Sequence, residues 1–309
     1  MTMMTKITVV GVGGSGCNAV SRMMKAKIKG VELIALNTDA QDLAKTKAHL
    51  KVRIGAKLTK GLGTGMNPEV GKKAALESKA EIAEVLKGAD MVFVACGLGG
   101  GTGSGAAPVV AEVAKGTEAL TVAVVTKPFS FEGTLRAKLA DLSSRKLKEK
   151  VDCLIAVQND RLLDILNPKT PVSSAFWVCD DILREAVSGI SDLIFLPGII
   201  NVDFADIKAV MRDSGTAIFG VGRARGEKRA EAAVKSALSS PLLNYSCRGA
   251  KGVLFNVSGG KDIALSEVEE VAKFINQEVS QSAKVIFGAV YDHGLPKGEI
   301  KVTMVATGF

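Results

Sequence analysis

Gly97-Leu98-Gly99-Gly100-Gly101-Thr102-Gly103-Ser104-Gly105 is the stretch from which the rest of the chain is best interpreted, and six of its nine residues are glycine. It follows an apolar run at 91–96 that predicts a buried strand, and it precedes a helical pattern at 106–114. Glycine lets a backbone take positive φ angles and approach a ligand closely. The free N–H groups and the dipole of a helix N-terminus favour phosphate. The stretch therefore predicts a phosphate-binding loop rather than a flexible linker.

Composition restricts the class of protein. With 309 residues, 47% of them hydrophobic, the chain is long enough for two domains. No apolar run reaches the roughly 18 residues of a membrane span, and no signal-peptide segment begins the chain, so we expect a cytoplasmic protein without direct membrane insertion. The net charge of +8 permits nucleic-acid binding. However, the basic residues are scattered among acidic ones and lack interleaved aromatics, so we expect solvated helix faces and no nucleic-acid partner.

Cysteine and histidine give no sign of a protein-held metal. The five cysteines contain no C-x-x-C pair, and we interpret them as reduced thiols in the core. His49 and His293 have no Cys or His neighbour at ligand spacing. We predict no metal site built from these side chains.

A second glycine pattern follows the first predicted strand, at 6–10. Gly11, Gly13 and Gly16 satisfy G-x-G-x-x-G, and Asp39 lies about 20 residues further on, where a ribose-binding acid belongs in a dinucleotide site. Alone, this pattern is a weak signal. It keeps open an NAD-dependent oxidoreductase as one reading of the chain.

A third glycine-rich segment, 55–66, lies between the other two and includes Lys57 and Lys60. Asn67-Pro68-Glu69 then predicts a helix start, with Asn as the N-cap and Pro at the first helical position. Loops at the carboxyl ends of parallel strands converge on one crevice. Three such loops favour a polyphosphate held from several sides, and no G-x-x-x-x-G-K-[ST] motif indicates a P-loop.

Polar residues follow two further predicted strands, 119–126 and 152–157. Glu132 and Arg136 are four residues apart at a helix start and so share one face. They form either a structural ion pair or a sugar and phosphate contact, and spacing alone does not decide between the two.

The segment 172–195 predicts a long helix that is apolar around most of its circumference, as expected for a spine buried between two domains. Asp180 and Asp181 interrupt its apolar pattern. A carboxylate can accept the N1–H and N2–H₂ donors of guanine, and Phe176, about one turn earlier, could lie against a base. The alternative is a stripe of the helix that faces solvent.

The remainder predicts a smaller α/β domain with a mixed sheet. Strands are expected at 216–221, 253–258, 284–291 and 299–306, and helices from about 203, at 227–238 and at 266–281. Ser266 and Glu269 fit a capping box. For Asp203 and Asp206, three apart at a helix start, the spacing alone favours capping.

Taken together, these motifs resemble FtsZ, the bacterial and archaeal branch of the tubulin family, over essentially the whole chain. The opening stretch contains the tubulin-family signature GGGTG[ST]G. The other matching segments are Asn37-Thr38-Asp39-Ala40-Gln41, Thr126-Lys127-Pro128-Phe129, Phe131-Glu132-Gly133, Asn201-Val202-Asp203-Phe204-Ala205-Asp206 and Val305-Ala306-Thr307-Gly308.

The resemblance implies a GTPase that polymerises head-to-tail into protofilaments of a cell-division ring, cytoplasmic and located at the division site when assembled. It implies a Rossmann-like GTP-binding domain with a parallel sheet at 1–171, a central spine helix at 172–196, and a smaller α/β activation and polymerisation domain with a mixed sheet at 197–309. The implied ligands are GTP and GDP, with Mg²⁺ bound mainly through the phosphates, and a monovalent cation is compatible with the site.

The resemblance also assigns roles to residues. Phosphates would be held by Gly13, Gly14, Ser15, Gly16, Cys17 and Asn18, and the β- and γ-phosphates by Gly100, Gly101, Thr102, Gly103 and Ser104. Glu132 and Arg136 would contact the ribose and phosphate region. Asn159 and Asp181 would read the guanine, with Phe176 against its face.

A final set of residues would act on a neighbour. Asn201, Asp203 and Asp206 would form a loop that reaches the nucleotide of the next subunit, which replaces the capping interpretation of the two acids. Neither subunit alone would then hold a complete site, so hydrolysis would wait for assembly. Asp203 and Asp206 would position the attacking water while Mg²⁺ offsets phosphate charge.

Three features depart from the family pattern. Asp180 stands where many relatives carry Asn, the net charge is basic where the family is commonly acidic, and the sequence ends at Phe309 without the linker and adaptor-docking peptide of the family. Division-ring adaptors are expected partners for the family, but not through that peptide here. Besides the oxidoreductase, a tubulin-like switch that binds GTP without forming filaments stays open.

Overall fold

The computed structural model describes residues 5–163, 166–167, 169–196, 198–240, 247–292 and 294–309. The chain divides into two compact units, Met1–Val187 and Ser188–Phe309. His293, one of the two histidines considered above, lies outside the described residues. Within the described part of the chain, no helix combines the length and the apolar character that a membrane span requires.

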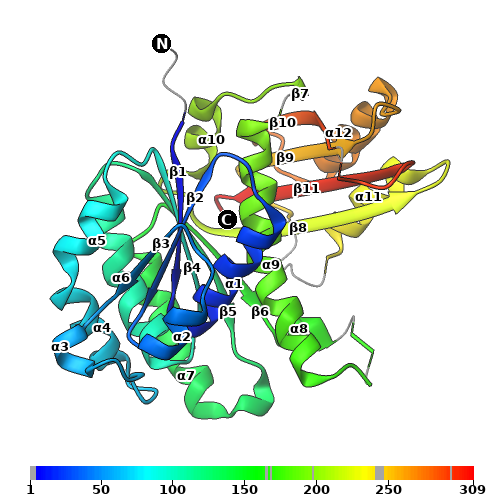
Figure 1. The fold of residues 1–309 in the computed structure, drawn as a ribbon. Coiled ribbons are helices and arrows are strands. Elements are labelled where there is room, and N and C mark those ends of the chain that lie inside the picture. The colour runs from blue at the N-terminus through cyan, green and yellow to red at the C-terminus, as the bar shows by residue number, and fades with distance from the viewer. Residues whose placement is uncertain (1–4, 164–165, 168, 197, 241–246, 293) are drawn as a thin grey trace. The chain divides into compact units, whose positions relative to one another are not determined.

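The N-terminal unit contains a parallel sheet of six strands in the order β3-β2-β1-β4-β5-β6. The strands span Ile7–Val12 (β1), Val31–Asn37 (β2), Leu50–Arg53 (β3), Met91–Gly97 (β4), Leu120–Lys127 (β5) and Cys153–Gln158 (β6). This is the order of a doubly wound fold, in which ligands bind beyond the carboxyl ends of the strands. Figure 1 shows these strands fanning out in the middle of the unit.

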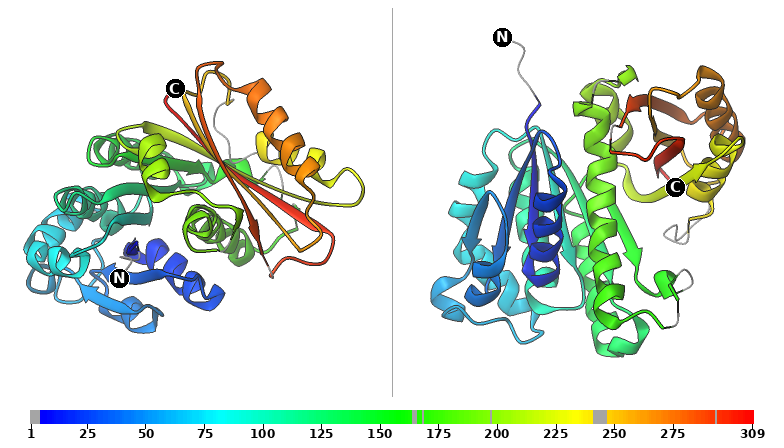
Figure 2. Two further views of the ribbon diagram at one scale, coloured as in Figure 1. Left: turned by 90° about the horizontal axis from the view of Figure 1, so that it is seen from above. Right: turned by 45° about the vertical axis from the view of Figure 1, so that its right-hand side comes forward.

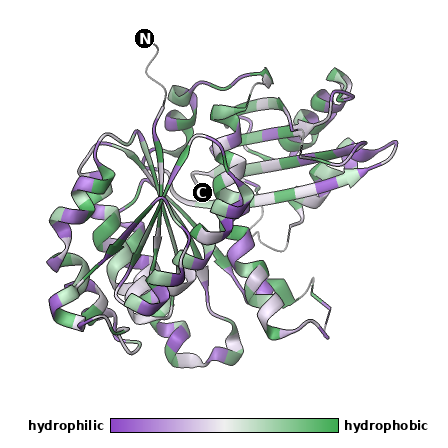
Figure 3. Ribbon diagram, in the orientation of Figure 1, coloured by the Kyte–Doolittle hydropathy of each residue, from purple (hydrophilic) through white to green (hydrophobic). Residues whose placement is uncertain are grey.

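Helices cover the sheet of the N-terminal unit. They are α1 (Gly13–Ala26), α2 (Ala40–Lys45), α3 (Ala56–Thr59), α4 (Pro68–Glu77), α5 (Lys79–Leu86), α6 (Gly101–Lys115), α7 (Thr134–Lys148) and α8 (Asp160–Leu163), with a 3₁₀ turn, η1, at Ser130–Glu132. The main core packs apolar residues of α4, α5, α6 and α7 against the alternate side chains of β1, β4 and β5. Figure 3 shows these central strands as the most hydrophobic part of the unit.

The glycine stretch at 97–105 is only partly a loop. Helix α6 begins at Gly101, five residues earlier than the sequence pattern predicted, so Gly101 to Gly105 form its first turns. The cause is close packing of helices: a Cβ on Gly105 would collide with the carbonyl oxygen of Pro68 in α4. These glycines let α4 and α6 approach more closely than side chains would allow.

Two polar residues singled out by the sequence, Asn67 and Asp39, cap helices in this unit. Asn67 is the N-cap of α4, as predicted, and its side chain accepts a hydrogen bond from Glu69 N at 3.0 Å. Asp39, the candidate ribose-binding acid of the oxidoreductase reading, caps α2 instead: its Oδ1 accepts from Gln41 N at 2.9 Å and from Asp42 N at 3.0 Å. The predicted loop at 55–66 contains the short helix α3.

Helix α9 spans Val172–Phe195, the bounds that the sequence predicts, and Figure 2 shows it as one continuous helix. The division between the two units falls within it, after Val187. Its middle turns are buried, including Leu183, Ala186 and Val187, whereas Val172 and Trp177 near its start are exposed.

The C-terminal unit contains the mixed sheet that the sequence predicts, in the order β8-β11-β9-β10-β7. Among the strand pairs that the structure describes in this unit, β9 and β10 are parallel and the others antiparallel. Helices α11 and α12 share one core with the sheet. The elements are β7 (Gly198–Ile200), α10 (Phe204–Met211), β8 (Gly215–Arg225), α11 (Arg229–Leu238), β9 (Gly252–Gly259), α12 (Leu265–Glu278), β10 (Lys284–Tyr291) and β11 (Glu299–Thr307).

The capping box predicted at Ser266 and Glu269 is wrong. Helix α12 begins one residue before Ser266, with Ala264 as its N-cap. Glu267 accepts a hydrogen bond from Ala264 N at 2.9 Å, so the reciprocal half of the motif lies two residues earlier than predicted. Arg229, which pairs with Glu267 at 2.6 Å, fixes that carboxylate from another element.

Candidate functional site

A cavity of about 520 Å³ opens at the carboxyl ends of β1, β4, β5 and β6 in the N-terminal unit. The three glycine-rich segments and the start of α9 contribute its walls, as expected for a crevice of a doubly wound sheet. Its lining residues are Val12, Gly13, Gly14, Ser15, Asn18, Thr64, Met66, Gly97, Leu98, Gly100, Gly101, Thr102, Gly103, Thr126, Pro128, Glu132, Arg136, Asn159, Phe176, Cys179 and Asp180.

Two helix N-termini meet at one end of this cavity. Helix α1 begins at Gly13, directly after β1, and α6 begins at Gly101, after β4. Gly13 has a φ of +71°, and a Cβ there would lie 2.9 Å from Gly103 N, so only glycine allows this approach. Because both N-termini carry unpaired N–H groups and the positive ends of helix dipoles, this end of the cavity suits an anion with several phosphates.

Three threonine hydroxyls extend this anion-binding end. Thr102 Oγ1 lies 3.0 Å from Thr38 Oγ1 and 3.2 Å from Thr64 Oγ1, in hydrogen-bond contact with both. Thr64 comes from the long glycine-rich segment, which therefore reaches the same site as the signature motif. Ser104 does not line the cavity; its buried Oγ accepts a hydrogen bond from Gly99 N at 2.8 Å and so fixes the loop before α6.

Glu132 and Arg136 form an ion pair across the end of η1 and the first turn of α7. Arg136 Nη1 donates to Glu132 Oε2 at 2.6 Å, and Glu132 Oε1 accepts from Phe129 N at 2.9 Å. Both residues also line the cavity. The ion pair, one of the two interpretations left open by the sequence, is therefore present, and it forms part of the cavity wall. A contact with a sugar or phosphate stays a prediction.

The opposite end of the cavity is aromatic and partly apolar. Phe176 lies edge-on to the buried Phe129, with ring centroids 5.5 Å apart. Cys179 lies on the same helix, and burial, followed by the nearby charge of Asp180, raises the pKa of its thiol to about 12. Asn159, at the end of β6, is buried, and its Oδ1 has no hydrogen-bond partner among the described residues. A flat polar ring would supply both an aromatic contact and a partner for this amide.

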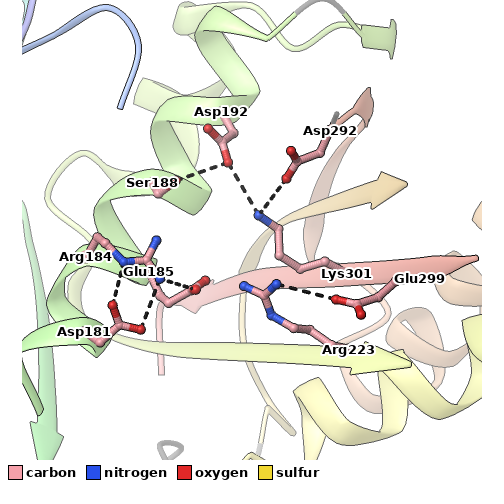
Figure 4. Close-up of polar contacts among 9 residues, drawn as sticks. All are labelled: Asp181, Arg184, Glu185, Ser188, Asp192, Arg223, Asp292, Glu299 and Lys301. Atoms are coloured by element: carbon pink, nitrogen blue, oxygen red, sulfur yellow. Dashed lines mark hydrogen bonds and ion pairs between the residues drawn. The ribbon is translucent and has the colours of Figure 1, made fainter. Parts of the chain in front are cut away.

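The acid that faces the cavity is Asp180, and not Asp181 as predicted. Asp181 does not line the cavity. Its carboxylate accepts from Arg184 Nε at 2.6 Å and from Arg184 Nη2 at 3.1 Å, and Arg184 also pairs with Glu185 (Figure 4). Successive helical residues point about 100° apart, so one of the two neighbouring acids lines the cavity and the other pairs along α9.

Asp180 is a buried carboxylate with three contacts to α1. Its Oδ1 accepts from Ser15 Oγ at 3.3 Å, and its Oδ2 accepts from Arg22 Nη2 at 3.1 Å and from Arg22 Nε at 3.4 Å. Burial raises the pKa of this carboxyl, whereas the hydrogen bonds and charge of Arg22 and the hydroxyl of Ser15 act in the opposite direction. The residue pattern left Asp180 and Asp181 as alternative guanine contacts, and the resemblance assigned the role to Asp181, because nothing local indicated which acid faces the cavity.

The structure brings together most of the predicted nucleotide-binding residues. Besides Ser104 and Asp181, Gly16 and Cys17 do not line the cavity. A Cβ on Gly16 would collide with Ala95 O in β4, and the buried Cys17 Sγ lies 3.8 Å from Leu36 O, so both serve the packing of α1 on the sheet. The residue roles did not include the lining residues Val12, Thr64, Met66, Gly97, Leu98, Thr126, Pro128, Cys179 and Asp180. Gly97 and Leu98 lie in the stretch predicted to bind phosphate, and the glycine-rich segment 55–66 gave an advance signal for Thr64 and Met66.

The predicted catalytic residues belong to the C-terminal unit and are exposed there. Asn201 Oδ1 accepts from Gly198 N at 3.0 Å. Asp203 is the N-cap of α10, with its Oδ1 accepting from Ala205 N at 3.3 Å, and Asp206 lies in the first turn of that helix. The capping role favoured by the spacing is thus present for Asp203.

No group of three or more His, Cys, Asp or Glu side chains suited to a metal ion occurs among the residues that the structure describes. The two carboxylates of the cavity, Glu132 and Asp180, are each paired with an arginine. A cation at this site would therefore be held chiefly by oxygens that a ligand brings.

Comparison with known proteins identifies relatives along nearly the whole chain. Residues 6–167 match the model of the Tubulin/FtsZ family GTPase domain, and residues 215–309 match that of the FtsZ family C-terminal domain. Cell division protein FtsZ 1 of Thermococcus kodakarensis is 50% identical over 303 residues, covering 98% of this chain and 80% of the relative. The corresponding protein of Pyrococcus abyssi is also 50% identical, covering 98% and 81%. A solved structure of an empty FtsZ dimer from M. jannaschii is 47% identical, with a TM-score of 0.96, covering 100% of this chain and 89% of that one.

Proposed function

The chain belongs to the tubulin/FtsZ family of GTPases, and we propose that it assembles head-to-tail into protofilaments that serve cell division, hydrolysing GTP where two subunits meet. The resemblance inferred from the motifs is confirmed by both family models. The relative from M. jannaschii was solved as a dimer, which supports self-association. In this proposal, residues 1–171 bind GTP, residues 172–196 form the central helix, and residues 197–309 serve polymerisation.

We place the phosphates of GTP at the two helix N-termini. Gly13, Gly14 and the start of α6 offer backbone donors, and Thr64 and Thr102 offer hydroxyls beside them. This arrangement supplies hydrogen bonds to phosphate oxygens without placing an acidic side chain among them. The Glu132–Arg136 pair would contact the ribose and the adjoining phosphate.

At the other end of the cavity we place guanine, with Phe176 against its face and Asp180 at its Watson–Crick edge. Asp180 replaces Asp181 in this role because only Asp180 lines the cavity. The unpaired Oδ1 of Asn159 would accept a further hydrogen bond from the nucleoside. Mg²⁺, when bound, would neutralise phosphate charge. It would be held mainly by phosphate oxygens, since the carboxylates of the cavity are engaged with arginines.

One observation carries the proposal that the active site is shared. Hydrolysis requires a group that orients the attacking water. The acidic residues of the cavity lining are Glu132 and Asp180, and each is committed to an arginine. Meanwhile Asp203 and Asp206 are exposed at the start of α10 in the other unit. If a second subunit presents this helix end to the phosphates, its acids supply the missing group.

Titration of the protein tests this proposal. GTP turnover per subunit should rise with protein concentration, and light scattering with electron microscopy should show filaments in GTP and Mg²⁺. A constant turnover over a wide concentration range would contradict a shared site. GTP binding without filaments would support the switch alternative. Calorimetric binding of NAD but not GTP would support the oxidoreductase, which has no role for the other two glycine-rich segments.

A mixing experiment tests which subunit supplies the acid. Asp206→Ala should keep GTP affinity and lose turnover by about 100-fold, the usual scale for removing a group that activates a nucleophile. Asp206→Ala is then mixed with Gly13→Val, whose pocket is blocked because a side chain at Gly13 would meet Gly103 N. Each variant alone should be inactive, but the mixture should regain turnover, because an intact Asp206→Ala pocket can meet the Asp206 of a Gly13→Val neighbour. Glu269→Gln, which removes an exposed acid on α12, is the matched control and should keep wild-type affinity and turnover. A mixture as inactive as its two components would mean that the acid acts within its own chain.

A further inference from the structure

Arg22 occupies an unusual position beside the cavity. It lies on α1 seven residues after Ser15, so the two side chains share one face of that helix. From that face both reach the same carboxylate: Ser15 at Oδ1 of Asp180 and Arg22 at Oδ2. The Arg22 side chain is 22% exposed and that of Asp180 is 9% exposed, so water only partly screens the pair.

Arg22 is itself held in place from a second side. Its guanidinium carbon lies 5.1 Å from the ring centroid of Trp177, one turn before Asp180 on α9. A guanidinium over an aromatic face is attracted by the ring, and its planar shape limits the orientations it adopts. Contact with the half-exposed Trp177 therefore helps to hold Arg22 in its position beside Asp180.

We propose that Arg22 is a positioning residue for base recognition: it orients Asp180 and keeps it negatively charged, so that the pocket selects guanine. The inference rests on the proposed role of this cavity as the GTP site. No contact between Arg22 and the nucleotide is required, because Arg22 does not line the cavity.

The geometry leaves Asp180 able to bind a base. Each carboxylate oxygen has about two acceptor positions. Oδ2 receives both Arg22 donors, whereas Oδ1 receives only the Ser15 hydroxyl among the contacts of the described residues. The free position on Oδ1 can accept one donor of the guanine edge, and a second donor would have to displace the Ser15 hydroxyl. Inosine keeps N1–H but lacks the N2 amino group, so ITP reports whether the amino group is bound.

The charge state of Asp180 decides whether it reads guanine. A protonated carboxyl presents a donor where guanine needs an acceptor. Burial and the neighbouring Asp181 favour the protonated form, and Arg22 and Ser15 favour the ionised form. Asp181 is itself paired with Arg184, which leaves Arg22 as the cation that faces Asp180. As pH falls through the pKa of Asp180, GTP affinity should be lost, and removing Arg22 should move that loss to a higher pH.

The experiment compares binding of GTP and ITP to wild type, Arg22→Gln and Arg22→Lys by calorimetry from pH 6 to 8.5. Arg22→Gln should bind GTP about tenfold more weakly at pH 7.5, which is the scale of one charge-assisted hydrogen bond. The deficit should grow as pH falls, and the preference for GTP over ITP should shrink. Arg22→Lys keeps the charge and should retain the wild-type pH profile. Arg225→Gln, which loses an ion pair with Glu299 in the other unit, is the matched control and should behave as wild type.

Three outcomes separate this inference from the proposed function. If wild type binds no guanine nucleotide, the proposed function fails. If wild type binds GTP and Arg22→Gln matches it in affinity, pH profile and GTP preference, the inference alone is overturned. It is also overturned if Arg22→Gln weakens GTP and ITP equally at every pH, which would indicate a structural role. In an Asp180→Asn background, adding Arg22→Gln should produce no pH-dependent loss, and such a loss would contradict the inference.

Discussion

In the N-terminal unit, the buried amide oxygen of Asn159 lies beside the cavity and has no hydrogen-bond partner among the described residues. In the C-terminal unit, the equally buried Lys301 has its ammonium between two carboxylates. Lys301 Nζ is 3.6 Å from Asp192 Oδ2 and 3.5 Å from Asp292 Oδ2, and Ser188 donates to the same Asp192 oxygen at 3.3 Å (Figure 4).

The difference separates two uses of buried polarity. A buried group whose neighbours satisfy it contributes to the fold, since removing one member leaves the others unpaired. A buried polar group that lacks a partner beside a cavity contributes little to the stability of the free protein. It gains a hydrogen-bond partner when a ligand binds. Variants of the two regions should therefore affect different quantities: stability for the Lys301 cluster and nucleotide affinity for the cavity.

Lys301→Met should give the largest effect. It leaves the partly buried Asp192 and Asp292 without their cation, and breaking a buried pair lowers the free energy of unfolding by about 3 kcal/mol. Urea unfolding would measure this change. GTP affinity should stay within about twofold of wild type, because every residue of the cavity lies in the other unit.

The matched control for Lys301→Met is Lys273→Met. Lys273 pairs with Glu269 at 2.9 Å, four residues away on α12, but both side chains are more than 60% exposed. Such an exposed pair contributes little to stability, because water screens it, so Lys273→Met should leave the free energy of unfolding close to that of wild type. Equal losses from the two variants would show that the Lys301 cluster does not stabilise the unit.

Asn159→Ala should have the opposite profile. The free energy of unfolding should change by less than about 1 kcal/mol, because the lost Oδ1 had no partner in the described structure. GTP affinity should fall about fivefold, the scale of one neutral hydrogen bond. Calorimetry and urea unfolding on the same preparation would give both values.

Asn256 provides the control for this second comparison. It is fully buried in β9 of the C-terminal unit, away from the cavity. Its Nδ2 donates to Ser258 Oγ at 3.2 Å, whereas its Oδ1, like that of Asn159, has no partner among the described residues. Asn256→Ala should lower stability and leave GTP affinity unchanged. If Asn159→Ala instead lowered stability and spared affinity, the amide would be a structural group and no part of the nucleotide site.

The sequence predicted the elements of the fold where local signals decide the structure, but not the contrast between Asn159 and the Lys301 cluster. The bounds of α9 and β10, and the N-cap at Asn67, were predicted correctly because apolar periodicity and the Asn-Pro pair act within a few residues. The convergence of the glycine-rich segments followed from the rule that parallel strands end at one edge. The early start of α6 was missed, since it depends on the packing of Gly105 against Pro68 in another helix.

The choice between Asp180 and Asp181 shows the limit most clearly. Both acids lie on one helical turn, and their periodicity is compatible with either one facing the cavity. Two contacts distinguish the acids in the structure. Arg22, which is 158 residues away in the chain, pairs with Asp180, whereas Arg184, on the same helix, pairs with Asp181. Sequence spacing does not report contacts between distant elements, so the assignment required the structure.

The smallest effect concerns the pH dependence of stability, and it compares two carboxylates of the C-terminal unit. Burial is the main cause that raises the pKa of Asp192, with Lys301 opposing it, whereas hydrogen bonding from Arg229 lowers the pKa of Glu267. A raised pKa stabilises the fold below the ordinary value of about 4, and this contribution is lost as pH rises through the raised pKa. A lowered pKa gives a contribution that is present above the ordinary value and lost as pH falls. Relative to Asp192→Asn, wild type should therefore lose unfolding free energy as pH rises above the ordinary value of about 4. Relative to Glu267→Gln, wild type should gain unfolding free energy as pH rises toward the ordinary value of about 4. Urea unfolding at several pH values would show slopes of opposite sign. Two slopes of the same sign would mean that burial does not control the pKa of Asp192. The ion pair with Lys301 would then have a larger effect on that pKa than the loss of solvent.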